Sequence, residues 1–128
     1  MADPGRAQKQ LPVVLLVDDE PALIDAMGQE LKQSCRLYTA PSAAAAETLF
    51  AARHYDVIVC DQMLPGEQGL DFLMRAMELI PSSRRILMTG YTNPEFITRS
   101  MSLAGLSACL VKPVHASEVS AAIRAALA

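Results

Sequence analysis

The sequence has few of the residues that build disulfides and transition-metal sites. Its three cysteines, Cys35, Cys60 and Cys109, are an odd number without a CxxC pair, and neither His54 nor His115 has metal-ligand spacing. We interpret the cysteines as small core hydrophobes that stay reduced, not as a metal or redox site. Reduced thiols suit a reducing compartment, so we expect the protein in the cytoplasm.

An excess of basic residues and a long apolar run are also missing. Eleven Lys and Arg against fourteen Asp and Glu give a net charge of −3, which offers no electrostatic footprint for nucleic acid or an anionic membrane. The apolar run at 13–17 stops at Asp18, far short of a signal or membrane helix. The polar residues before it, 1–12, are predicted to form a mobile segment, and the expected partners are proteins.

Nucleotide-binding loops and internal repeats are absent from the sequence. No GxGxxG follows the first apolar run and no GxxxxGK is present, which argues against a nucleotide-binding domain. A chain of 128 residues with 52% hydrophobic and 20% charged residues predicts one compact domain, which we place at residues 13–128.

Short apolar runs alternate five times with longer stretches of helical spacing. This alternation is typical of βαβ units around a parallel sheet. The first, third and last runs are continuously apolar, as in strands covered on both faces, whereas the second is more polar and is expected at an edge. The predicted strands are Val13–Val17, Arg36–Ala40, Val57–Cys60, Arg85–Met88 and Ala108–Val111.

Five helices are predicted to follow these strands. The first begins at Pro21, the second is capped by Ser42 and runs to about Arg53, and the third ends before Pro81. Asn93 caps the fourth, which Gly105 ends, and the fifth runs to the end of the chain. The first helix has an apolar stripe that is expected to face the sheet. The apolar residues of the first, third, fourth and fifth helices are Ile24, Met27 and Leu31; Leu70, Leu73, Met77 and Ile80; Ile97, Met101 and Ala104; and Val119, Ile123, Ala126 and Leu127.

Polar residues stand where four of these strands end. Asp18 and Asp19 follow the first strand, Asp61 the third, Thr89 the fourth and Lys112 the fifth. A five-unit doubly wound sheet commonly has the flavodoxin-like order 2-1-3-4-5, which makes the first and third strands neighbours at the switch point where ligands bind. We therefore predict an α/β, flavodoxin-like (βα)5 sandwich in which the three aspartates converge.

Three converging carboxylates predict a hard divalent cation. They repel one another unless one is protonated or a cation neutralises them, and oxygen ligands without nearby His or thiolate suit Mg²⁺. A carboxylate beside Mg²⁺ is also a nucleophile toward phosphorus. Lys112 would supply a second cation for the charge on the transferring group, and the Thr89 hydroxyl would hydrogen-bond that group after transfer.

Four motifs in order, LVDDEP at 16–21, DQMLPGEQG at 61–69, LMTG at 87–90 and LVKP at 110–113, each close a predicted strand. Together they resemble the response-regulator receiver domain of two-component signalling over nearly the whole chain. The resemblance implies that Asp61 is the phosphoacceptor and that Asp19, Asp61 and the Met63 main-chain carbonyl ligate Mg²⁺, with Asp18 reaching it through water. It also implies Thr89 as the switch hydroxyl, Lys112 as the phosphoryl partner and a cis peptide between Lys112 and Pro113.

The resemblance implies partners as well. A histidine kinase or phosphotransfer protein would donate the phosphoryl group, and the loaded domain would switch its surface for a downstream output domain or protein without being a turnover enzyme. The fourth helix, fifth strand and fifth helix are the implied contact surface, including that of a homodimer. The sequence leaves open the cognate kinase, and whether the chain is complete or is the front of a longer regulator.

Each site residue also has a simpler interpretation when taken alone. Asp18 and Asp19 fit a helix cap, Asp61 a turn residue, Thr89 a strand terminus and Lys112 a solvated charge; their shared place at one rim favours chemistry. Two other functions stay open. One is a receiver-like interaction module that is not phosphorylated, and the other is a Mg²⁺-dependent aspartyl phosphohydrolase, which would want a DxD arrangement after the first strand and a cap segment.

One position departs from the family pattern, and two others carry unusually bulky side chains. Many receivers carry Tyr or Phe three residues before the lysine, where this chain has Cys109, so we expect the signal to pass through the loop at 89–94, in which Gly90 gives freedom. Tyr91 fits either a substitute for that aromatic or a half-exposed loop residue. Met63 and Tyr91 are bulky at the positions that flank the phosphoryl group in the family, which predicts slow hydrolysis of the phosphorylated form.

Overall fold

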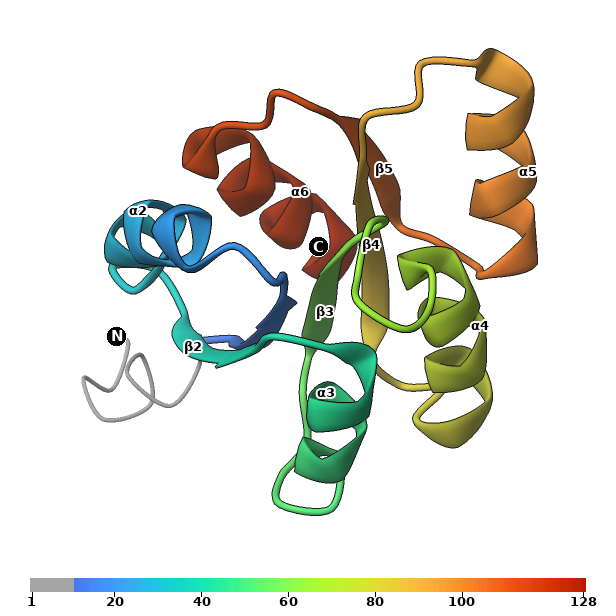
Figure 1. Ribbon diagram of the computed structural model, residues 1–128. Coiled ribbons are helices and arrows are strands. Elements are labelled where there is room, and N and C mark those ends of the chain that lie inside the picture. The colour runs from blue at the N-terminus through green and yellow to red at the C-terminus, as the bar shows by residue number, and fades with distance from the viewer. Residues whose placement is uncertain (1–10) are drawn as a thin grey trace.

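Five parallel strands form one sheet in the order β2-β1-β3-β4-β5, as predicted (Figure 1). The computed structural model describes residues 11–128, so the predicted mobile segment lies outside the described residues except for Leu11 and Pro12. The strands are β1 (Val13–Val17), β2 (Arg36–Ala40), β3 (Val57–Asp61), β4 (Arg84–Thr89) and β5 (Ala108–Val111). The helices are α2 (Pro21–Leu31), α3 (Ala43–Leu49), α4 (Gly69–Leu79), α5 (Pro94–Leu103) and α6 (Ala116–Leu127).

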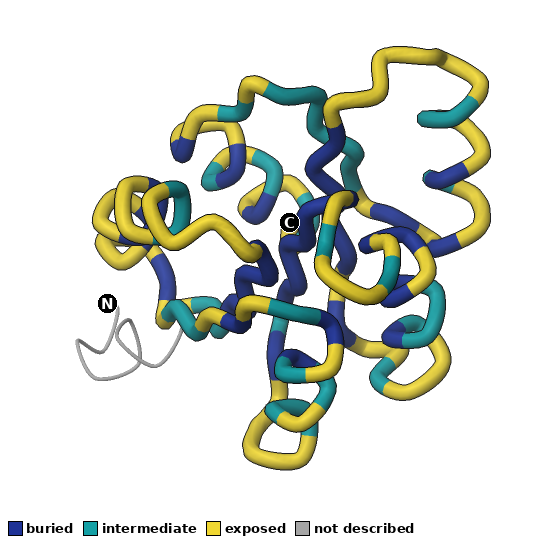
Figure 2. Tube along the Cα trace, viewed as in Figure 1, coloured by how far each residue is buried: buried dark blue, intermediate teal, exposed yellow. Residues whose placement is uncertain are grey.

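The side chains of β1 alternate between two apolar layers. Val14 and Leu16 face the layer that α2 and α6 cover, whereas Leu15 and Val17 face the layer beneath α3, α4 and α5. All four side chains are buried, because a parallel strand in the middle of such a sheet has helices on both faces. Figure 2 shows the buried stretches gathered along the central strands.

The two edge strands differ from the central ones in burial. The polar strand β2 lies at one edge, as predicted. The other edge is β5, whose residues are all only half-buried (Figure 2). The continuous apolar run at 108–111 therefore does not mark a strand that is fully covered on both faces. Composition alone did not distinguish this edge strand from the buried interior ones.

Local signals set most of the helix boundaries. Ser42 Oγ accepts a hydrogen bond from the Ala45 N–H at 3.1 Å, and Asn93 Oδ1 accepts one from the Glu95 N–H at 2.8 Å, so both predicted caps are present. Gly105, with φ of +54°, follows the end of α5 as expected. The Lys112-Pro113 peptide is cis.

The second helix is shorter than predicted. It ends at Leu49 instead of continuing to Arg53, and the Phe50 and Ala52 N–H groups bond to carbonyls three residues back, which tightens and closes the turn. The chain then brings the Tyr55 ring into the core, where it is buried. Burial of Tyr55 thus competes with the helix propensity of the alanine-rich segment.

The sequence predicts no membrane-spanning helix, and the lengths and hydropathy of the helices test this prediction. Within residues 11–128, no helix combines the length and the apolar character that crossing a bilayer requires.

Candidate functional site

The carboxyl ends of β1 and β3 bring the predicted acidic residues to one place. Val17 of β1 pairs with Cys60 of β3, so Asp18 and Asp61, each one residue further along, lie beside one another. Asp61 is the last residue of β3 and Thr89 the last of β4, while Lys112 directly follows β5. Parallel register therefore places the polar end of every strand except the edge strand β2 on the same rim.

Three carboxylates meet at this rim. Ligand oxygens of Asp18, Asp19 and Asp61 all lie within 4.8 Å of one another. The Asp18 and Asp61 side chains are buried, with 1% and 3% of their surface exposed, whereas Asp19 is open to solvent. Water therefore screens the repulsion between the two buried carboxylates only weakly.

Among the three aspartates, Asp18 has a raised pKa. Burial raises the pKa of its carboxyl, the Glu20 N–H opposes that rise, and Asp61 and Asp19 add to it against the attraction of Lys112. Asp18 Oδ1 accepts the Glu20 N–H at 2.9 Å, but the buried Oδ2 has no hydrogen-bond partner in the described part of the chain. An orphaned carboxylate oxygen among other carboxylates fits a hard divalent cation such as Mg²⁺.

Lys112 supplies a positive charge next to Asp61. Its Nζ lies 2.5 Å from Asp61 Oδ1, and because no well-aligned hydrogen bond reaches that oxygen, the contact is an ion pair. Partial burial pulls the pKa of Lys112 down, but the nearby Asp61, Asp18 and Glu20 outweigh this effect and raise it. Lys112 therefore stays a cation at the rim.

Thr89 is fully buried at the end of β4. Its Oγ1 accepts the Tyr91 N–H at 3.0 Å, and its carbonyl accepts the Lys112 N–H at 2.7 Å. Because Oγ1 acts as an acceptor here, the hydroxyl hydrogen remains available for a second partner. The backbone of Thr89 thus joins the β4 and β5 ends of the rim.

Gln62 is a residue of this site that the sequence did not single out. Its side chain, 1% exposed, accepts the Leu70 N–H at 2.9 Å and donates to Gln68 Oε1 at 3.2 Å. The amide therefore bridges the two ends of the β3–α4 loop (residues 62–68). A glutamine after an aspartate is usually a surface residue, and only the folded chain reveals that this one is buried.

Two glycines near the start of α4 have different structural roles. Gly66 adopts φ of +86°, a conformation that L side chains rarely adopt. At Gly69, however, an added Cβ would lie 2.1 Å from the Asp61 carbonyl oxygen. Close approach of helix α4 to the backbone of Asp61 demands this glycine.

Two bulky side chains lie together at the outer side of the rim. Tyr91 Oη and Met63 Sδ are 3.9 Å apart, and the Tyr91 ring meets the ring of Phe96 of α5 edge-on with centroids 5.1 Å apart. Met63 is 63% exposed and Tyr91 47% exposed. Cys109, at the position where many receivers have an aromatic, is half-buried and packs against the same core cluster as Phe96.

Comparisons with known proteins agree with this geometry. The response regulator receiver domain pattern matches residues 14–124. The hydrogenase transcriptional regulatory protein HoxA of Cupriavidus necator is 38% identical over 100 residues, 78% of this chain and 21% of HoxA. The probable transcriptional regulatory protein TcrX of Mycobacterium tuberculosis is 32% identical over 95% of this chain and 52% of TcrX. The chain thus spans between a fifth and about half the length of these relatives.

Solved structures give the same result. The signal receiver domain of an HD domain-containing protein from Pseudomonas fluorescens Pf-5 aligns with a TM-score of 0.84 and 30% identity, over 92% of this chain and 95% of that one. A CheY-like response regulator receiver domain protein from Methanospirillum hungatei aligns with a TM-score of 0.81 and 27% identity, over 90% and 92%. In both cases the aligned residues make up at least 90% of this chain.

The close approach of Gly69 to Asp61 predicts a large effect of one methyl group. We expect Gly69→Ala to lower the free energy of unfolding by ~2 kcal/mol or more, because the Cβ meets main-chain atoms that cannot rotate away. Gly90→Ala is the control, since a Cβ added there would have no atom within 4 Å and the change should stay within about 0.5 kcal/mol. Urea unfolding of both variants measures this, and equal stabilities would contradict the close-approach argument.

The crowded Asp18 carboxylate predicts a stabilising substitution. Because the pKa of Asp18 is higher in the folded than in the unfolded chain, its ionised form destabilises the fold at neutral pH, and the penalty fades as pH falls through the folded pKa. With divalent ions chelated, Asp18→Asn should gain about 1 kcal/mol at pH 7 and nothing below the unfolded pKa, since Asn keeps the acceptor for the Glu20 N–H. A variant no more stable than wild type at pH 7 would refute this.

Proposed function

The chain belongs to the response regulator receiver domain family, and from this premise we propose that Asp61 accepts a phosphoryl group from a histidine kinase or a histidine phosphotransfer protein. The observation that carries the proposal is the setting of Asp61. Its carboxylate is buried, forms an ion pair with Lys112 and shares a cluster with Asp18 and Asp19. A structural carboxylate would need only the lysine, whereas two further acids beside it call for a cation and a reaction.

The transfer is a displacement at phosphorus. An oxygen of Asp61 attacks the phosphorus of the donor's phosphohistidine, the P–N bond breaks, and the electron pair stays on the imidazole nitrogen, which takes up a proton. Asp61 then carries an acyl phosphate. Lys112, which already lies beside Asp61 Oδ1, is placed to neutralise charge on the phosphoryl oxygens.

The acidic cluster suits Mg²⁺. Asp18, Asp19, Asp61 and the Met63 main-chain carbonyl would hold the ion, and the unpartnered Oδ2 of Asp18 is the atom that most needs it. When bound, Mg²⁺ supplies positive charge that draws the phosphoryl oxygens toward Asp61.

Thr89 is proposed as the switch. In the structure its Oγ1 accepts the Tyr91 N–H, so a new bond from its hydroxyl to a phosphoryl oxygen would pull on the loop at 89–94. That loop leads directly into α5, and Phe96 of α5 packs on Tyr91. A change at Thr89 therefore has a short path to the surface formed by α5, β5 and α6, which we propose contacts the output or a second copy of the chain.

The rest of the proposal concerns cellular setting. We propose a cytoplasmic signalling domain that does not turn over substrate, with protein partners and no direct contact with nucleic acid, in keeping with a net charge of −3. An aspartyl phosphohydrolase would instead hydrolyse phosphomonoesters continuously. An interaction module without phosphorylation would need neither the acids nor Lys112.

The proposal predicts a single modified residue. With a small acyl phosphate donor and Mg²⁺, wild-type protein should gain the mass of one phosphoryl group, and Asp61→Ala should gain none because the nucleophile is missing. Asp71→Ala, which removes an exposed acid from α4, should be modified like wild type. Intact-mass spectrometry reads all three. An unmodified wild type, or a modified Asp61→Ala, would overturn the assignment.

Met63 and Tyr91 predict a long-lived acyl phosphate. In the family the side chains at these two positions flank the phosphoryl group, and here both are bulky and contact one another, so we expect them to hinder water that approaches it. Met63→Asn combined with Tyr91→Ala should therefore shorten the lifetime of the phosphorylated form, whereas Leu103→Asn, an exposed apolar residue at the end of α5, should not. Decay after removal of the donor is followed by intact mass. An unchanged decay rate in the double variant would count against the idea.

A further inference from the structure

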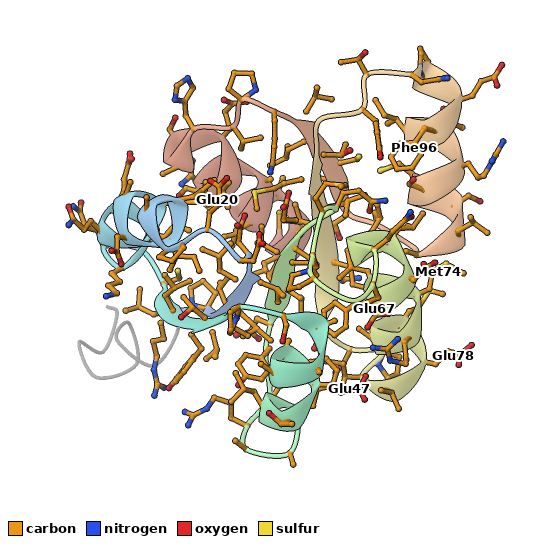
Figure 3. The ribbon with its side chains drawn as sticks, in the orientation of Figure 1. Glu20, Glu47, Glu67, Met74, Glu78 and Phe96 are labelled. Carbon is orange, nitrogen blue, oxygen red and sulfur yellow. The ribbon has the colours of Figure 1, made fainter. Side chains whose placement is uncertain are left out.

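Arg75 of α4 ties the β3–α4 loop to two helices. Its Nη1 and Nη2 donate to the two carboxylate oxygens of Glu67 at 3.0 and 2.7 Å, and its Nε donates to Glu47 Oε1 at 2.5 Å. Glu67 belongs to the loop and Glu47 to α3, and Figure 3 shows both at the side of α4 that faces α3. One guanidinium therefore joins the loop, α3 and α4.

The guanidinium itself is held in place. It lies 5.7 Å from the centroid of the Phe72 ring, and Phe72 is fully buried one turn earlier in α4. The planar fork matches a carboxylate bidentately, which a lysine cannot do. The hydrogen bonds from Arg75 also lower the pKa of Glu67, so this carboxylate remains charged.

The loop has attachments of its own on which the ion pair builds. An isolated antiparallel bridge pairs Met63 with Gln68, the neighbour of Glu67, and Leu64 packs against the apolar core. Gly66, by contrast, adopts the left-handed conformation with no atom within 4 Å of where a Cβ would lie. Glu67 follows Gly66 directly, so its pairing with Arg75 limits the freedom that the glycine allows. The carbonyl of Met63 lies within the segment that this pairing holds.

We propose that Arg75 is a positioning residue for the divalent-metal site: by holding Glu67 it fixes the loop that presents the Met63 carbonyl, and so strengthens Mg²⁺ binding. The inference rests on the proposed function, because it takes this loop as a source of a metal ligand. Arg75 itself touches neither the metal nor the phosphoryl group.

The sign of the effect separates positioning from simple electrostatics. Arg75 is a cation that pairs with the loop after Asp61, and a cation repels Mg²⁺, so removing its charge should by itself make Mg²⁺ bind more tightly. If Arg75 orders a ligand, its removal should make Mg²⁺ bind more weakly. The two accounts therefore predict opposite changes.

The test is the Mg²⁺ dissociation constant, measured by calorimetric and NMR titration of the full chain. Arg75→Gln should bind Mg²⁺ roughly three- to tenfold more weakly, which is the range for a partly exposed bidentate pair within a network. Arg75→Lys keeps the charge but loses the fork, and should also weaken binding. Amide exchange at residues 63, 64 and 66–68 should rise in both variants, while exchange in the central strands stays unchanged.

Arg99→Gln is the matched control. Arg99 is exposed on α5 and makes no ion pair among residues 11–128, so this variant has the same change of charge and should bind Mg²⁺ as wild type does or slightly more tightly. In a Glu67→Gln background, adding Arg75→Gln should cause no further weakening, because the pair is already broken.

Two results would overturn the inference, and they are distinguishable. Unchanged or tighter Mg²⁺ binding by Arg75→Gln and Arg75→Lys, with wild type binding Mg²⁺ and accepting a phosphoryl group, overturns the role of Arg75 alone. A wild-type chain that neither binds Mg²⁺ nor becomes phosphorylated overturns the proposed function and this inference with it. Because Arg75→Lys preserves charge and most of the side-chain packing, the test still decides if Arg75→Gln proves unstable.

Discussion

Mutual repulsion among the carboxylates of Asp18, Asp19 and Asp61 is the constraint that organises the rim of this sheet. Their oxygens lie within 4.8 Å of one another, and two of the three side chains are buried. The fold balances this repulsion in part, with the Lys112 cation on Asp61 and the Glu20 N–H on Asp18. One oxygen of Asp18 remains without a partner among the described residues, which fits the divalent cation proposed for this site.

The two loops that flank Asp61 and Thr89 are held to different degrees. After β3, Gln62 bridges the loop from within, Gly69 brings α4 against the Asp61 backbone, and Arg75 holds Glu67 from outside. After β4, residues 91–95 are all exposed. In the proposed reaction, the first loop would preserve the geometry of the metal ligands, and the second would be free to follow Thr89.

Helix α5 shows the same contrast between its two ends. At its carboxyl end, the buried guanidinium of Arg85 donates to the Ala104 carbonyl at 2.7 Å and the Gly105 carbonyl at 3.2 Å. At its amino end the cap is Asn93, an exposed residue of the loop that follows Thr89. In the proposed switch, a change at Thr89 would therefore reach α5 at its exposed amino end.

The sequence alone determined the α/β class, the strand order, the capping residues and the acids and lysine at the strand ends, because these depend on alternating apolar periods and on chemistry at one residue. It could not determine that β5 is only half-covered, that the second helix ends early where Tyr55 is buried, that Gly69 lies against the Asp61 backbone, or that Gln62 and Arg75 hold the loop after Asp61. Those features depend on which segments meet in space. The space beside Gly69, where an added Cβ would meet the Asp61 carbonyl, and the contact between Arg75 and Glu47 on another helix form only when the layers pack. Tertiary structure therefore decided these features.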